Sequence, residues 1–361
     1  MNRDPRSVPG SPAPEGASTA PSGPDVPSRK APRLRGRAAG AATGIVAATI
    51  ALFLLSWLVE PQSLRESSLL GMLPFAAILA IVAVGQTLVI QQGGIDLSVP
   101  GMVSLTVVIM TAHPDGDSGK LAEAIVFALL AALAAGTLNG LLVSRVGITP
   151  IVTTLGMNAL LYGVVIQVSG GTPTTTTDAL KDFASSRVLG IPVTVPIAIA
   201  VTLVVALIVK KTVVGRRFEG VGASDTGARA AGLVVSRHKL SAYLAAAVLY
   251  CVAGMLLAGI ISTPSSFQGD SYLLPSVAAV VLGGTSLLGG KGSVAASAVA
   301  ALFLTQLDQL LLTSGASSAV QSLVQAGALV VGIAIYSVPW RRVRDWIQGR
   351  TERSVATTAP S

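Results

Sequence analysis

Residues 93–98, Gly-Gly-Ile-Asp-Leu-Ser, form a polar motif between two long apolar runs, and their types could serve a solute pathway. The glycines Gly93 and Gly94 allow a sharp turn and leave backbone N–H groups free. An ionised carboxylate at the centre of a bilayer costs about 2.5–3.5 kcal/mol, so Asp96 needs a polar cavity or an interface. Asp96 and Ser98 can equally cap the following helix, and the sequence leaves both interpretations open.

Side-chain amides and one further carboxylate extend the set of candidate pathway residues. Gln86 and Gln91 lie just before the motif and could hydrogen-bond a hydroxylated solute, although amides inside membranes also join neighbouring helices. Asp308 lies in a later apolar run with Gln306 beside it, where it can line a cavity or mark the outer end of a helix. Together with the motif at 93–98, these side chains predict a pathway for a polar solute.

A basic segment at 215–240 contains a candidate docking helix. Ser224 or Asp225 can cap a short helix that runs to about Ala231, and Gly232 can end it. Arginines flank the helix on both sides, which suits contact with a soluble cytoplasmic protein. A basic loop that only fixes topology is the alternative, and the caps at both ends favour docking. The predicted contact residues are Ser224, Asp225, Thr226, Arg229 and Gly232.

A second glycine-rich segment, 283–292, does not fit a phosphate-binding P-loop. With Lys291 as the P-loop lysine, glycine is needed at 285 and Ser or Thr at 292, but Thr285 and Gly292 stand there. We interpret the segment as turns at the cytoplasmic end of a short helix, where backbones can pack closely. The predicted structural turns are Gly93, Gly94, Gly283, Gly284, Gly289 and Gly290.

The sequence offers no metal site and no catalytic constellation. Its two histidines, His113 and His238, lie in predicted loops, and no Ser/His/Asp set falls on facing apolar segments. The chain is therefore predicted not to be an enzyme, with no catalytic residue, no metal and no cofactor of its own.

The elements that must position these residues are apolar helices. Of 361 residues, 51% are hydrophobic and 12% charged, against about 25% charged in soluble domains, and mean hydropathy is +0.70. This composition makes a soluble enzyme untenable and predicts an all-α, polytopic membrane protein. About ten spans are expected, the third and eighth short and broken: 39–59, 69–91, 97–112, 121–143, 150–168, 191–209, 240–262, 274–289, 294–313 and 319–338.

The distribution of positive charge predicts the orientation of these spans. With the N-terminus inside, the inside segments hold 21 of the 25 Lys and Arg residues, which supports an even number of spans and two cytoplasmic termini. The predicted domains are a disordered basic tail at 1–38, a transmembrane domain at 39–340 and a cytoplasmic tail at 341–361. The net charge of +8 is assigned to the membrane surface and not to nucleic acid.

Five motifs in one order resemble the permease subunits of ribose-type (RbsC-like) ABC sugar importers. They are GGIDLS at 93–98, NGLLV at 139–143, ITPIVTTLG at 148–156, the loop from Gly215 to Leu233, and GGTSLLGGKGS at 283–293. The resemblance covers roughly residues 65 to 340. It adds Asn139 to the predicted pathway residues, so that this set is Gln86, Gln91, Asp96, Ser98, Asn139 and Asp308.

The resemblance implies a fold similar to vitamin B12-type importers, located in the cytoplasmic membrane of a prokaryote. It also implies three partners: a separate ATPase that binds ATP and Mg²⁺, an extracellular or periplasmic solute-binding protein, and a second permease copy, identical or paralogous. The expected function is import of a monosaccharide such as ribose or xylose by alternating access. An ion-coupled secondary transporter of a small polar solute is the alternative.

Overall fold

The computed structural model describes residues 35–172 and 174–337, and this part of the chain is almost entirely helical. The predicted tails at 1–38 and 341–361 lie outside the described residues, except that the first helix begins at Arg35. The helices are α1 (Arg35–Val59), α2 (Glu66–Gln91), α3 (Val99–Ala112), α4 (Leu121–Leu141), α5 (Pro150–Ser169), α6 (Asp178–Ser185), α7 (Thr194–Lys211), α8 (Val213–Ala223), α9 (Asp225–Ala230), α10 (Val235–Ile260), α11 (Leu273–Leu282), α12 (Val294–Thr313) and α13 (Ser318–Ser337).

Seven helical segments in the described residues are long and apolar enough to cross a membrane. They are 42–59, 66–91, 118–146, 150–169, 194–211, 235–260 and 294–313. Each of the ten predicted spans coincides with a helix, but α3, α11 and the apolar part of α13 are shorter than a full crossing. The chain is thus a polytopic helical membrane protein, and the count of ten spans stays a prediction.

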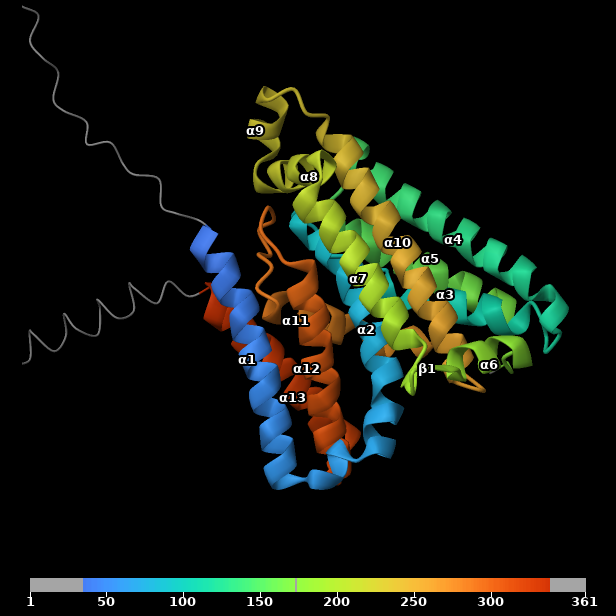
Figure 1. Ribbon diagram of the computed structural model, residues 1–361. Coiled ribbons are helices and arrows are strands. Elements are labelled where there is room, and N and C mark those ends of the chain that lie inside the picture. Colours follow the sequence, from blue (N-terminus) through green and yellow to red (C-terminus); the bar gives the residue numbers. More distant parts are fainter. Residues whose placement is uncertain (1–34, 173, 338–361) are drawn as a thin grey trace, which may run out of the picture. The chain divides into compact units, whose positions relative to one another are not determined.

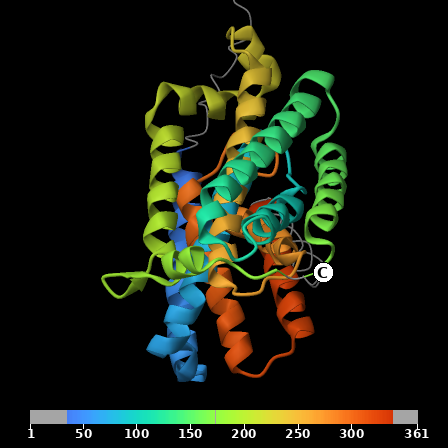
Figure 2. The ribbon, with the colours of Figure 1, turned by 90° about the vertical axis from the view of Figure 1, so that its right-hand side faces the viewer.

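Helices α2 and α10 form the centre of the bundle, with two thirds of each apolar window buried. Both are hydrophobic on all sides, as expected for helices surrounded by other helices. Helix α10 packs along α2, α3 and α4, while α2 also packs along α12 and α7 (Figures 1 and 2). Glycines permit the close approach: Gly136 of α4 faces Ala247, and Gly254 of α10 faces Thr106.

Buried polar side chains join these helices in pairs. A hydrogen bond between spans is worth only about 0.6 kcal/mol on average, because the unfolded chain in the membrane also finds partners, but it fixes the register of the two helices. The pairs are Tyr250 to Gln86 at 2.9 Å, Thr87 to Ser297 at 2.9 Å and Gln306 to Ser56 at 3.0 Å.

Two short helices reach only part of the way through the bundle. Helix α3 has 14 residues and α11 has 10, so α11 is about 15 Å long at 1.5 Å per residue. A 3₁₀ turn, η4 (Gln268–Tyr272), leads into α11 and packs against α3. These two interruptions agree with the expectation that the third and eighth apolar segments are broken helices.

The predicted loop from 169 to 190 contains elements that its composition did not reveal. Thr177 caps the short helix α6, whose Leu180 and Ala184 are buried against α10. A two-residue antiparallel pair, β1 (Arg187–Val188) and β2 (Ile191–Pro192), follows with Leu189 at its exposed tip. Within this segment, α6 therefore packs against α10, while β2 contacts α2 and α7.

Candidate coupling and pathway site

The short helix predicted near residues 224–232 is present as α9, which we call the docking helix after the role predicted for it, and both of its caps are those expected. The Ser224 hydroxyl accepts a hydrogen bond from the Gly227 N–H at 3.1 Å. At the other end Gly232 has φ +76°, a conformation that glycine adopts without strain. The N–H groups of Gly232 and Leu233 donate to the carbonyls of Arg229 and Ala228, both at 2.9 Å, which closes the helix.

Helix α8 precedes α9, and sequence reasoning did not predict it. The Thr212 hydroxyl caps α8 by accepting a hydrogen bond from the Gly215 N–H at 3.1 Å. This Thr is the sequence feature from which the start of α8 could have been predicted. A small cluster of buried apolar side chains then binds α8, α9 and the start of α10 into one unit: Val221, Ala228 and Val235, with Leu233 against them. Figure 1 shows α8 and α9 together at one end of the bundle.

An ion pair fixes the docking helix to the long helix α10. The Lys239 ammonium donates to the Asp225 carboxylate at 2.6 Å, and the lysine side chain is only 20% exposed. Arg229 lies one turn further along α9 and is exposed. Of the predicted contact residues, Asp225 thus has an internal partner, whereas Arg229 remains available to another protein.

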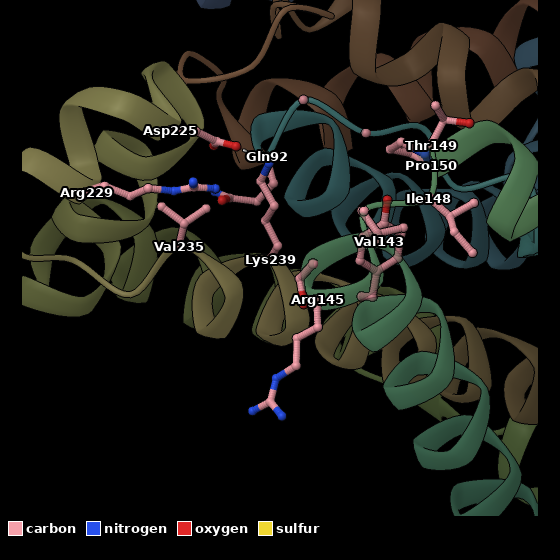
Figure 3. A pocket seen from close by; sticks show the side chains of 15 residues that line it. Gln92, Val143, Arg145, Ile148, Thr149, Pro150, Asp225, Arg229, Val235 and Lys239 are labelled. Atoms are coloured by element: carbon pink, nitrogen blue, oxygen red, sulfur yellow. Dashed lines mark hydrogen bonds and ion pairs between the residues drawn. The ribbon is translucent and has the colours of Figure 1, made fainter.

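A cavity of about 450 Å³ lies beside α9 (Figure 3). Asp225 and Arg229 lie on one side of it, and Ile148, Thr149 and Pro150 lie on the other. The other lining residues are Gln92, Gly93, Gly94, Val143, Ser144, Arg145, Gly147, Val235, Lys239 and Tyr243. The cavity therefore separates the docking helix from the start of α5 and from the Gly93–Gly94 turn.

The two predicted glycine turns, nearly 200 residues apart in sequence, meet each other and α8. The Gly290 N–H donates to the Gln91 carbonyl at 2.9 Å. A Cβ at Gly289 would lie 2.6 Å from the Gly222 carbonyl oxygen, and a Cβ at Gly222 would overlap the Gln91 carbonyl. We call this contact of 91–94, Gly222 and 289–292 the glycine junction. It links α8 directly to the turn between α2 and α3 and to the segment between α11 and α12.

The Asp96 carboxylate is buried and bonded within its own turn. It accepts hydrogen bonds from the Ser98 N–H at 2.8 Å and the Ser98 hydroxyl at 2.5 Å. Burial raises the pKa of Asp96, and the two bonds from Ser98 act against that rise. Asn139 joins the group by donating to the Ser98 hydroxyl at 3.0 Å, and Thr154 accepts from the Leu97 N–H at 2.9 Å. Three of the predicted pathway residues are thus brought together.

The other predicted pathway residues lie apart from this group. Gln86 contacts Tyr250 in the core, and its Nε2 has no partner. Gln91 is fully buried, and neither its Nε2 nor its Oε1 has a partner. The Asp308 carboxylate accepts from Gln325 Nε2 at 2.8 Å to each oxygen, which joins α12 to α13. A role for these residues in a pathway stays a prediction.

The described residues contain no group of three or more His, Cys, Asp or Glu side chains that could hold a metal ion. The one cysteine, Cys251, is fully buried in α10. What the arrangement offers is a capped helix at one end, a junction of close backbones beneath it, and polar side chains inside an apolar bundle.

Long apolar helices that break at polar residues are the architecture of membrane transport proteins, and this chain is a multi-pass membrane protein of that class. Residues 68–334 match the family described as the permease component of branched-chain amino acid transport systems, and the chain belongs to that family. Its members are transport subunits, which agrees with the prediction that the chain is not an enzyme.

Similar curated proteins are named as ribose or autoinducer 2 import permeases. The ribose import permease protein RbsC of Escherichia coli K12 is 32% identical over 294 residues, 79% of this chain and 91% of the relative. RbsC of Bacillus subtilis is 30% identical over 288 residues, 79% of this chain and 89% of the relative. The autoinducer 2 import permease LsrD of Photorhabdus laumondii is 31% identical over 314 residues, which is 84% of this chain and 94% of the relative. No solved structure gives a significant match.

Proposed function

We propose that this chain is the membrane-spanning subunit of an importer driven by a separate ATPase, and that it carries a small hydroxylated solute such as ribose. The observation that carries the proposal is the docking helix α9. It is capped at both ends, its Arg229 is exposed, and it is joined through α8 to the glycine junction. The names of the similar permeases support import, and those of RbsC support a sugar.

The proposed coupling runs through packed groups. An ATPase that moves α9 also moves α8, because Val221, Ala228 and Val235 hold the two helices together. Gly222 of α8 has no free space against the Gln91 carbonyl, so this motion reaches the ends of α2 and α11. Interfaces without spare volume transmit displacement as a change between two discrete arrangements, which alternating access requires.

The proposed solute is neutral because the interior offers it few charges. The predicted spans 69–91, 97–112 and 150–168 contain no Asp, Glu, Lys, Arg or His, and Glu66 and Asp96 lie just outside them. Hydroxyl groups need only hydrogen-bonding partners, and weak binding suffices where a separate solute-binding protein outside the membrane supplies affinity.

We propose that a second copy of the chain, or a paralogue, completes the transporter. Helix α5 is a predicted span that neighbours cover on one side, and its window is only 28% buried. Gly156 and Gly163 lie seven residues apart on its open side, with nothing within 4 Å of the position of a Cβ. Small residues on one face of a helix allow a second helix to approach closely in a membrane. The proposed orientation places α9 and both termini in the cytoplasm.

The test is uptake of radiolabelled D-ribose by proteoliposomes that contain the permease, its ATPase and its binding protein. Uptake of radiolabelled L-leucine is measured in parallel, because an amino acid is the alternative solute. Arg229→Glu reverses an exposed charge on the docking helix, and we expect uptake to fall about tenfold, the effect of losing one interfacial charge pair. Lys211→Glu is the matched control, because Lys211 is exposed at the end of α7 and outside α9.

Two results would contradict the proposal. Accumulation of solute by the permease alone, with an ion gradient and no ATPase, would identify a secondary transporter. Uptake of leucine but not of ribose would keep the importer and replace the sugar with an amino acid.

A further inference from the structure

A polar and aromatic cluster joins α5 to the turn η4. The Tyr162 hydroxyl donates a hydrogen bond to the Asp270 carboxylate. The Phe267 ring packs edge-on against Tyr162, with the ring centres 5.1 Å apart. Asn158 lies one helical turn before Tyr162, and its Oδ1 accepts from the Gly101 N–H at 2.8 Å. We call Asn158, Tyr162, Phe267 and Asp270 the mid-membrane cluster.

Helix lengths place this cluster about half a bilayer thickness from the predicted cytoplasmic ends of α5 and α11. Tyr162 is twelve residues beyond Pro150, the start of α5, which is about 18 Å along a helix. Asp270 comes just before α11, whose length of about 15 Å separates η4 from the glycine junction. Both distances are about half of the ~30 Å hydrocarbon thickness. The turn η4 is held at this depth because the Gly269 N–H donates to the Ser104 hydroxyl of α3 at 2.9 Å.

The cluster is open on the surface of the single chain. Asp270 is exposed, and Phe267 is 38% exposed. A carboxylate in mid-membrane does not face lipid but a water-filled space or a partner. Two of its residues lie on α5, where Tyr162 directly precedes Gly163 of the open face, so a second copy packed on that face would lie beside the cluster.

The side chains fit one class of solute. A carboxylate accepts hydrogen bonds from hydroxyl groups, a phenol and an amide can donate or accept, and an aromatic ring packs against the C–H groups of a sugar. An amino acid would also need a cation for its carboxylate, but residues 146–180 and 240–290 contain no Lys, Arg or His. We propose that the mid-membrane cluster is the site where the permease holds a neutral, hydroxylated solute during transfer. This inference rests on the proposed function.

Transport measurements test the site directly. In proteoliposomes with the ATPase and binding protein, we expect Tyr162→Phe and Asp270→Asn each to lower D-ribose uptake about tenfold, because each removes a hydrogen bond that involves a charged group. Asp182→Asn is the matched control, since Asp182 is an exposed carboxylate on α6, outside the cluster. Normal ribose uptake by both cluster variants would overturn the site and leave the proposed function standing.

Thiol labelling tests the site without any transport. Ser271→Cys places an exposed thiol next to Asp270, and Leu203→Cys places one on α7, where Leu203 is 56% exposed near the middle of a span. A membrane-impermeant methanethiosulfonate should label Ser271→Cys and not Leu203→Cys, and D-ribose should slow the labelling. The native Cys251 is fully buried and gives no background. Equal resistance of both thiols would exclude a water-filled site at the cluster, even in an importer that carries ribose.

Discussion

Gly94 occupies a position where even a methyl group has too little room. A Cβ there would lie 2.5 Å from the Tyr243 hydroxyl oxygen and 3.2 Å from a methyl carbon of Val89. Tyr243 is buried in α10 and also lines the cavity beside α9. The glycine thus keeps the turn after α2 tight against α10, beside the cavity that α9 lines.

Substitution of Gly94 should therefore be harmful, and a second substitution should relieve it. We expect Gly94→Ala to lower stability by about 1–3 kcal/mol through overpacking, seen as a lower melting temperature in detergent. Tyr243→Phe removes the atom that the new methyl group meets, so the double variant should recover part of the loss. Gly71→Ala is the control, because nothing lies within 4 Å of that position in α2. A double variant that melts no higher than Gly94→Ala would show that the hydroxyl is not the obstacle.

One side of helix α8 has no free space, because it packs against the glycine junction. On α8, Gly222 faces the Gln91 carbonyl in the glycine junction, whereas Gly220, two residues earlier, has nothing within 4 Å. The two glycines share one helix and the same helix propensity. Any difference between them on substitution by alanine therefore reports on the junction and not on α8 itself.

This pair gives a prediction at the scale of the element. Gly220→Ala should be neutral or slightly stabilising, because alanine favours a helix by about 1 kcal/mol over glycine. Gly222→Ala should separate α8 from the junction and abolish most ATP-driven D-ribose uptake, measured beside the melting temperature of each variant. Equal uptake by the two variants would mean that the junction carries no coupling motion.

Local signals predicted the elements that depend on nearby residues. Ser224 and Gly232 bounded α9 correctly, because a cap is an interaction within four residues of the chain. Helix α8 was missed, since Arg216, Arg217 and Glu219 make it polar on average and its apolar side becomes apparent only against Val235. The glycine turns were predicted one by one. Their meeting was not, because nothing in a sequence reports contacts between residues so far apart.

Across the whole molecule, the apolar pattern located the helices but did not determine how many of them cross the membrane completely. All ten predicted spans overlap helices, because an apolar segment in lipid must satisfy its backbone hydrogen bonds internally, although α3 and α11 are too short to cross a membrane. The sequence did not predict the mid-membrane cluster, because Tyr162 and Asp270 are 108 residues apart and neither belongs to a motif. Which end of the bundle faces the cytoplasm rests on the positions of Lys and Arg alone.

Two exposed leucines at opposite ends of the predicted topology can decide the orientation. Leu189, 97% exposed, is at the tip of the β1–β2 pair in a predicted outer segment, and Leu288, 93% exposed, is in the glycine-rich segment 283–292, which is predicted to lie at the cytoplasmic end of a short helix. With the buried Cys251 as the only native thiol, an impermeant maleimide should label Leu189→Cys in intact cells and Leu288→Cys only after permeabilisation. The reverse pattern would place α9 outside, where no ATPase could reach it, and labelling of both in intact cells would rule out an odd number of crossings between them.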